Sequence, residues 1–172
     1  MRSLSGLVMS MLEESLDSID GVLDVGILVV AHFENPLRED ALLFLRDVLS
    51  WKNRLIIPLT GFLGAYHILT RYLRVSRVEA KISLSDTLKV GSPSFYKDVT
   101  EDVVGKALDY AVSYKIESWD GYLIAIARKF NTRNIYTLDT KLKKIRDIIA
   151  VNPLPEEKTK QYHQFLKNRS SS

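Results

Sequence analysis

The segment Gly21-Val22-Leu23-Asp24-Val25-Gly26-Ile27-Leu28 decides the fold, because it places an acid directly after a short apolar run. Gly21 to Leu23 predicts a short buried strand, and the apolar run from Ile27 to Ala31 is compatible with more strand or with a first helical turn. An unpaired carboxylate buried in such a run would strongly oppose folding. Asp24 therefore belongs at the strand end, aimed into a cleft, or at the N-cap of a following helix, and the two roles are compatible.

Strands and helices alternate along the rest of the chain. Further strands are predicted at Leu55-Ile56-Ile57, briefly within Gly91 to Asp98, at Asn134 to Leu138 and at Ala150-Val151. Helix starts are predicted at Asn35-Pro36, Ser76, Thr100 and Ser118. A last core helix is expected through Leu142, Ile145, Ile148 and Ile149. Short apolar strands between helices predict an α/β fold: a three-layer α/β/α arrangement with a short central parallel sheet of four to five strands.

The length and composition predict one main domain with additions at both ends. The 172 residues suit a single core. We expect an N-terminal helical extension over residues 1–20, the domain over 21–153, and a charged C-terminal arm or helix, outside the core, over 154–172. The absence of cysteine excludes disulfides and sulfur ligands for metals. Acids within the first twenty residues argue against a signal peptide or a membrane span, so a cytoplasmic protein without a membrane partner is expected.

Three acids lie where a parallel sheet would bring them together. Asp24 and Asp139 follow two predicted strands, and Asp120 lies in the first turn of the helix expected to begin at Ser118. Each has a structural alternative, since Asp24 and Asp139 can cap helices and the helix dipole favours an acid at Asp120. Clustered carboxylates need a cation to stay ionised together. An all-oxygen site suits Mg²⁺ or Mn²⁺.

These stretches resemble the PIN-domain family, and within it the VapC-like toxin ribonucleases of archaeal type. The segments that carry the likeness are Leu23-Asp24-Val25-Gly26-Ile27-Leu28, Ser118-Trp119-Asp120-Gly121-Tyr122 and Tyr136-Thr137-Leu138-Asp139. They are similar to the family's opening motif, its helix start with an acid and its Thr-x-Asp strand end. The resemblance extends from about Val22 to Val151. It implies that Asp24, Asp120 and Asp139 are catalytic metal ligands, with Glu117 and Thr137 as candidate outer-shell groups.

The resemblance also implies a function and partners. It implies a Mg²⁺- or Mn²⁺-dependent ribonuclease that hydrolyses RNA phosphodiester bonds, acts as the toxin of a toxin–antitoxin pair, forms a homodimer and binds a small antitoxin protein. One departure qualifies this expectation. Gly64 stands where the family usually places a Glu, and no acid occurs between Asp47 and Glu79. The alternative is a catalytically weakened PIN-like module that binds RNA or protein.

Other features carry weaker expectations. A phosphotransfer domain of the dehalogenase type needs a second Asp two residues after Asp24, where Gly26 stands. His67, one turn beyond Gly64, could lean toward the same cleft, but a partly exposed His on an otherwise core-facing helix is the favoured interpretation. Two basic stretches are present, Arg71, Arg74, Arg77 and Lys81, and Lys141, Lys143, Lys144 and Arg146. Such stretches usually form solvated helix faces, but beside an acidic cleft they would bind phosphates.

Overall fold

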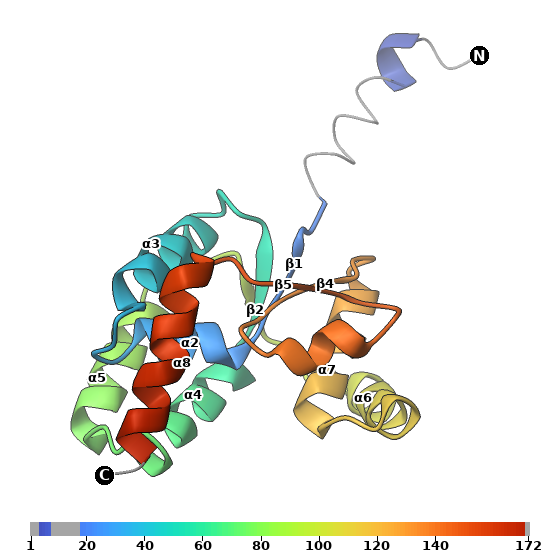
Figure 1. Ribbon diagram of the computed structural model, residues 1–172. Helices are drawn as coiled ribbons and strands as arrows, with labels where there is room; N and C mark the ends of the chain where they lie inside the picture. Colours follow the sequence, from blue (N-terminus) through green and yellow to red (C-terminus); the bar gives the residue numbers. More distant parts are fainter. Residues whose placement is uncertain (1–3, 8–17, 171–172) are drawn as a thin grey trace.

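The computed structural model describes residues 4–7 and 18–170 (Figure 1). Residues 4–7 are helical and exposed, and most of the N-terminal extension predicted over residues 1–20 lies outside the described residues. Within the described part of the chain, no helix has the length and apolar character that crossing a membrane requires.

The centre of the molecule is a parallel sheet. In the described ranges it has five strands in the order β3-β2-β1-β4-β5. Their bounds are β1 Gly21–Leu23, β2 Leu55–Pro58, β3 Phe95–Tyr96, β4 Asn134–Tyr136 and β5 Ile149–Val151. Val22 in the central strand pairs with Ile56 on one side and Ile135 on the other. All three are buried, as expected for a parallel sheet covered on both faces.

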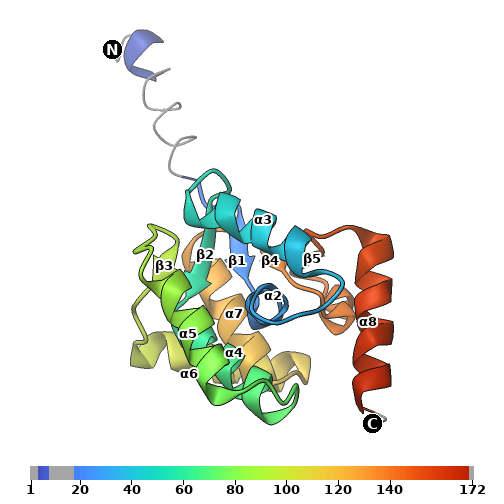
Figure 2. The same ribbon diagram turned by 90° about the vertical axis from the view of Figure 1, so that its left-hand side faces the viewer.

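Helices cover both faces of the sheet (Figures 1 and 2). One face carries α6 (Glu101–Tyr114) and α7 (Ser118–Lys129). The other carries α2 (Val25–Ala31), α3 (Arg38–Leu49), α4 (Thr60–Arg71), α5 (Arg77–Leu88) and α8 (Glu156–Ser170). The predicted three-layer α/β/α fold is therefore confirmed.

Each face of the sheet has its own hydrophobic core. Val22 and Ile56 pack on the side of α7, whereas Leu23 and Ile57 pack on the side of α2 and α4. The two sets alternate because successive side chains of a strand point to opposite faces. The short apolar run of β1 is thereby buried on both sides. The polar residue that follows it, Asp24, lies at the carboxyl end of this central strand.

Two predicted helix caps are confirmed, a third helix begins where expected but with a different cap, and one predicted start is wrong. Ser76 Oγ accepts from the Glu79 amide at 3.1 Å, and Thr100 Oγ1 accepts from the Val103 amide at 3.3 Å. Asn35 does not begin a helix: α3 starts at Arg38, and the Asn35 side chain accepts from Leu37 N and donates to two carbonyls at the end of α2. Its hydrogen bonds are used to build the turn between α2 and α3.

Helix α7 begins at Ser118, as expected, but Ser118 is not its cap. Glu117, not Ser118, occupies the N-cap position there, and it makes no side-chain cap bond. Its carboxylate is therefore not engaged at the helix start.

The end of the chain also differs from expectation. The last predicted core helix is replaced by a 3₁₀ turn, η1 (Thr140–Lys144), followed by β5. Leu142 and Ile145 are buried without a helix, because the turn alone brings them into the α7 core. Beyond β5, the segment expected to lie outside the core forms α8, whose Tyr162 is buried and packs edge-on to Phe33 with ring centroids 6.3 Å apart.

Candidate active site

Asp24 lies at the carboxyl end of β1, in the middle of the sheet. The chain passes from β1 to β2 on one side, and β4 returns on the other, so the strand order reverses at β1. Ligands of parallel α/β sheets bind beyond the strand ends at such a point. Asp24 occupies the N-cap position of α2 but makes no side-chain cap bond. Its carboxylate is therefore not needed to begin the helix.

Two side chains orient the Asp24 carboxylate. Trp119 Nε1 donates to Oδ1 at 3.1 Å, and Thr137 Oγ1 donates to Oδ2 at 2.6 Å. Asp24 is only 7% exposed, and this burial raises its pKa, partly offset by the two hydrogen bonds. Thr137 is the residue expected in an outer shell. Trp119 was not predicted, although a partly buried indole N–H usually finds an acceptor.

Asp120 lies in the first turn of α7, as predicted, and is half-buried. Burial and then the negative charges of Asp24, Asp139 and Glu117 raise its pKa to about 6. The other three predicted acids therefore lie within electrostatic reach of Asp120. Lys141 opposes the shift but does not cancel it.

Asp139 fills its expected structural role and also lies within electrostatic reach of Asp24. Its Oδ1 accepts from the Lys141 amide at 2.8 Å, so it caps η1. Its own amide donates to Thr137 Oγ1 at 2.9 Å, which ties it to the group that holds Asp24. Asp139 also raises the pKa of Asp24 through its charge. Asp139 therefore caps η1 and still acts on Asp24 through its negative charge.

The carboxylates suit a hydrated divalent ion. Among the described residues, no group of three or more His, Asp or Glu side chains is placed to enclose a metal directly. Mg²⁺, however, usually keeps several waters and binds through one or two carboxylates. The repulsion that raises the pKa of Asp120 is the kind that a bound cation relieves. The chemistry of the donors therefore fits Mg²⁺ or Mn²⁺ held partly through water.

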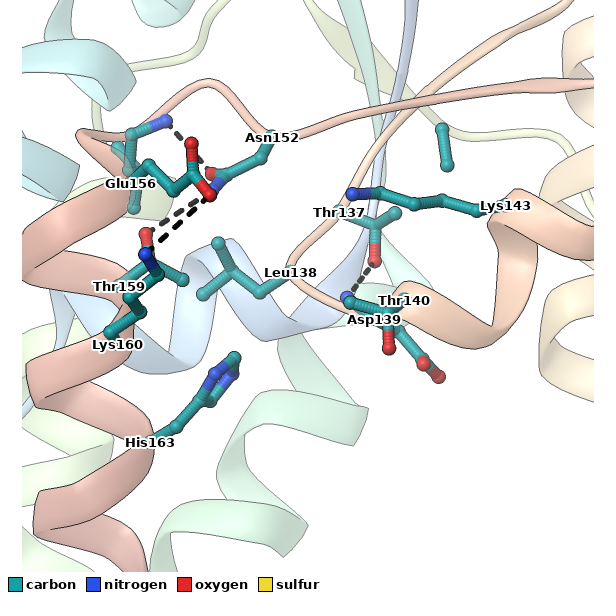
Figure 3. Close-up of a pocket in the computed structure, with 12 residues that line it drawn as sticks. Thr137, Leu138, Asp139, Thr140, Lys143, Asn152, Glu156, Thr159, Lys160 and His163 are labelled. Carbon is teal, nitrogen blue, oxygen red and sulfur yellow. Dashed lines mark hydrogen bonds and ion pairs between the residues drawn. The ribbon is translucent and has the colours of Figure 1, made fainter.

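Two cavities flank the acids on either side of η1. One, of about 640 Å³, is lined by Glu117 and Asp120 together with Lys141, Lys144 and Arg146. The other, of about 360 Å³, lies between the segment that follows β4 and helix α8 (Figure 3). Its lining includes Thr137, Leu138, Asp139, Thr140 and Lys143, together with side chains of α8. The second basic stretch thus lies beside the acids. The first, from Arg71 to Lys81, lines neither cavity.

The geometry agrees with the comparison to known families. The PIN domain family matches residues 21–148, about three quarters of the chain. The chain belongs to the PIN domain family. The matched range contains Asp24, Asp120 and Asp139 and ends before α8, so in this PIN domain α8 lies outside the part that defines the family.

Solved structures share the PIN fold at low sequence identity. A toxin–antitoxin complex from Klebsiella pneumoniae is 18% identical over 78% of this chain and 98% of its own, with a TM-score of 0.51. A VapC toxin from Mycobacterium tuberculosis that cleaves the sarcin–ricin loop is 15% identical over 74% of this chain and 97% of its own, with a TM-score of 0.57. A protein from Pyrobaculum aerophilum is 13% identical over 91% of this chain and 99% of its own, with a TM-score of 0.54. Comparison with curated proteins finds no significant match.

Gly64 faces the start of α2 in this PIN domain. A Cβ built on it would lie 3.3 Å from Val25 Cγ2, the side chain that follows Asp24. A longer side chain at this position would therefore begin next to the acid at the end of β1. His67, one turn further along α4, is exposed and lies edge-on to Tyr72.

The raised pKa of Asp120 predicts a pH-dependent gain in stability for Asp120→Asn in metal-free buffer. The folded pKa of about 6 lies above the reference of 3.8, so the ionised acid opposes folding. This penalty develops as pH rises from about 4 to 6 and is full above that range. The shift corresponds to at most about 3 kcal/mol, and partial solvent exposure reduces the expected gain to about 1–2 kcal/mol.

Urea denaturation at pH 4.5 and pH 8 measures this gain, which should be clear only at pH 8. Asp109→Asn, an exposed acid of α6, is the control and should show no such dependence. An equal gain at both pH values would mean that charge repulsion is not its source.

Proposed function

We propose that this PIN-domain protein is a Mg²⁺- or Mn²⁺-dependent ribonuclease in which Asp24, Asp120 and Asp139 hold the ion. The observation that carries the proposal is the buried carboxylate of Asp24 at the switch point of the sheet. Two donors orient it, and Asp120 and Asp139 lie within electrostatic reach of it. A purely structural acid would not be placed among other acids, whereas a cation site requires them.

The surrounding side chains have distinct tasks in this proposal. Trp119 and Thr137 hold Asp24 in one orientation, which is the usual work of groups behind metal ligands. Glu117, exposed at the start of α7, holds a water of the outer shell. Lys141 and Lys144 bind backbone phosphates without reading sequence. When bound, the ion supplies a more acidic water and neutralises charge on the phosphodiester.

The biological context is part of the same proposal. The Klebsiella neighbour is a toxin–antitoxin complex, and the Mycobacterium neighbour is a toxin that cleaves an RNA loop. By this likeness we propose that the protein is the toxin of such a pair, with RNA as its substrate and a small antitoxin protein as its partner. A homodimer is also proposed, from the resemblance of the sequence motifs to the VapC-like group.

The test is cleavage of single-stranded RNA with and without Mn²⁺. The parent should cleave only when Mn²⁺ is present, and Asp139→Asn should abolish cleavage. Asn keeps a side-chain oxygen for the Lys141 amide, so the cap of η1 is preserved. Asp109→Asn, which removes an exposed acid from α6, should cleave as the parent does. Cleavage that persists in Asp139→Asn would overturn the assignment.

A second candidate function is a PIN-like binding module with little turnover. Two observations favour it: Gly64 offers no carboxylate beside Val25, and the described acids do not enclose a metal directly. This module would bind RNA through Lys141 and Lys144 without cleaving it. The two candidates differ in what an added carboxylate would do.

Gly64→Glu should tighten Mn²⁺ binding and raise Mn²⁺-dependent cleavage. The new side chain starts beside Val25 and adds a negative charge next to Asp24, and metal affinity rises with the number of charged ligands. We expect roughly tenfold tighter binding, the lower end of what supporting groups contribute at metal sites. The helix should tolerate the change, because mid-helix Gly is a poor helix former.

Calorimetric Mn²⁺ titration and the RNA assay measure this effect. Gly64→Gln, equal in size but uncharged, is the matched control and should gain nothing. If Gly64→Glu folds but behaves as Gly64→Gln does, position 64 does not face the metal. If it gains metal affinity while neither it nor the parent cleaves RNA, the binding module is the better description.

A further inference from the structure

We propose that α8 completes a nucleotide-binding subsite, in which the cavity between η1 and α8 holds one nucleotide of the RNA strand next to the cleaved bond. The inference rests on the proposed ribonuclease function and adds residues outside the range that the family matches. Its central observation is that Asp139 and the α8 side chains Lys160 and His163 line the same cavity.

The cavity has the size and position of a substrate pocket. Its volume of about 360 Å³ lies near the low end of ligand pockets, which hold roughly 300–1,000 Å³, and so suits a single nucleotide. Asp139 and Thr140 form one wall, and α8 forms the other (Figure 3). A strand that crosses the acids from the basic cavity beyond η1 would enter this cavity next.

Packing of two α8 side chains against the domain places the helix as a wall of the cavity. Tyr162 is buried against Phe33, and Thr159 is buried with its hydroxyl donating to the Pro155 carbonyl at 3.0 Å. Lys160 and His163 are three residues apart and so share one side of the helix. That side is exposed and faces the cavity. The helix therefore presents these two side chains to the cavity.

The charged groups suit the phosphates of an RNA strand. Lys143 extends from η1 and Lys160 stands on α8, so an ammonium group lies on each wall (Figure 3). Lys160 has a contact to Glu156 at 3.9 Å, and both side chains are largely exposed. Such a pair is weak in water, so a phosphate can replace Glu156 as the partner of Lys160.

The remaining lining suits a base. The His163 ring and the Leu138 side chain project into the same space from opposite walls (Figure 3). A base can pack between them, since bases of single-stranded RNA stack on aromatic side chains, His included. Phosphate contacts on two sides and a ring for the base distinguish a nucleotide from a simple anion.

The subsite is tested by RNA binding in EDTA at pH 8, where no cleavage occurs. Fluorescence anisotropy with a labelled single-stranded 12-mer gives Kd over a range of salt concentrations. Lys143→Ala and Lys160→Ala should each lower the slope of log affinity against log salt by about 0.7, the value for one phosphate contact on a single strand. His163→Ala should weaken binding roughly fivefold or more without changing that slope.

Lys158→Ala is the matched control. It removes the same charge from the same helix, but Lys158 lies outside the cavity and pairs with Asp40 at 2.7 Å. It should bind RNA with the slope of the parent. In the Mn²⁺ assay, His163→Ala should raise KM and leave kcat unchanged, because the subsite binds substrate and transition state equally.

The outcomes separate the subsite from the proposed function. If the parent binds RNA but the three cavity variants match it in affinity and slope, the subsite is overturned and the ribonuclease proposal stands. If Lys158→Ala lowers the slope as much as Lys160→Ala does, binding is only diffuse attraction to charge, and the subsite is likewise overturned. If the parent neither binds nor cleaves RNA, both proposals fail.

Discussion

Asp24→Asn should abolish Mn²⁺-dependent RNA cleavage, with a loss of at least about 10²-fold, while the free energy of unfolding in metal-free buffer stays unchanged or rises. The loss follows from removing a proposed ligand, which should exceed the 10- to 100-fold effect of groups behind ligands. Stability is kept because Asn retains an oxygen for Trp119 and removes a charge that burial disfavours. It also relieves the repulsion with Asp139.

Asp24→Ala provides the contrast. It leaves the Trp119 indole and the Thr137 hydroxyl without their acceptor, and each unsatisfied buried donor costs about 1–3 kcal/mol. We therefore expect Asp24→Ala to lose roughly 2–4 kcal/mol in urea denaturation with EDTA, and Asp24→Asn to lose nothing. Equal destabilisation by both substitutions would show that the charge of Asp24 serves the fold.

Gly121→Ala should lower the free energy of unfolding by about 3 kcal/mol or more. A Cβ at this position would lie 2.2 Å from the Ala107 carbonyl oxygen and 3.1 Å from the Ala111 amide nitrogen, both backbone atoms of α6. Backbone atoms cannot rotate away, so α6 and α7 would have to separate. The strain would act beside Asp120 and Trp119, so we expect weaker metal binding as well.

Gly105→Ala is the matched control, because no atom of another residue lies within 4 Å of the Cβ it would add. It lies in the middle of α6 and should stabilise the protein by about 0.5–1 kcal/mol, the usual gain of Ala over Gly in a helix. Urea denaturation of both variants measures the difference. If both substitutions shift stability alike, the contact between α6 and α7 is looser than the structure shows.

The sequence alone determined the layers of this protein and the positions of its acids along the predicted strands and helices. Apolar runs such as Gly21 to Leu23 are too short for helices and too apolar for a half-exposed sheet, so they require a parallel sheet covered on both faces. Caps such as Ser76 and Thr100 are local hydrogen bonds within three residues. Local features of this kind can be read from neighbouring residues, and these two caps are predicted correctly, whereas the helix start at Asn35 and the cap at Ser118 are not.

The tertiary structure decided what lies around those acids. Trp119 and Thr137 bond to a carboxylate that lies 95 and 113 residues away along the chain. No local pattern records such a pairing. For the same reason, burial of Leu142 and Ile145 could be read from the sequence, but not that a 3₁₀ turn would achieve it. A buried position is compatible with several backbone forms until its partners are known.

The C-terminal segment shows the same division most clearly. Its charged composition predicted an arm outside the core, because charged side chains are mostly exposed to water. Only the fold brings Phe33 to the place where Tyr162 can be buried. That contact fixes α8, and α8 in turn sets His163 across the cavity from Asp139. The sequence determined which residues can carry the chemistry, and the packing of distant segments decided which of them meet.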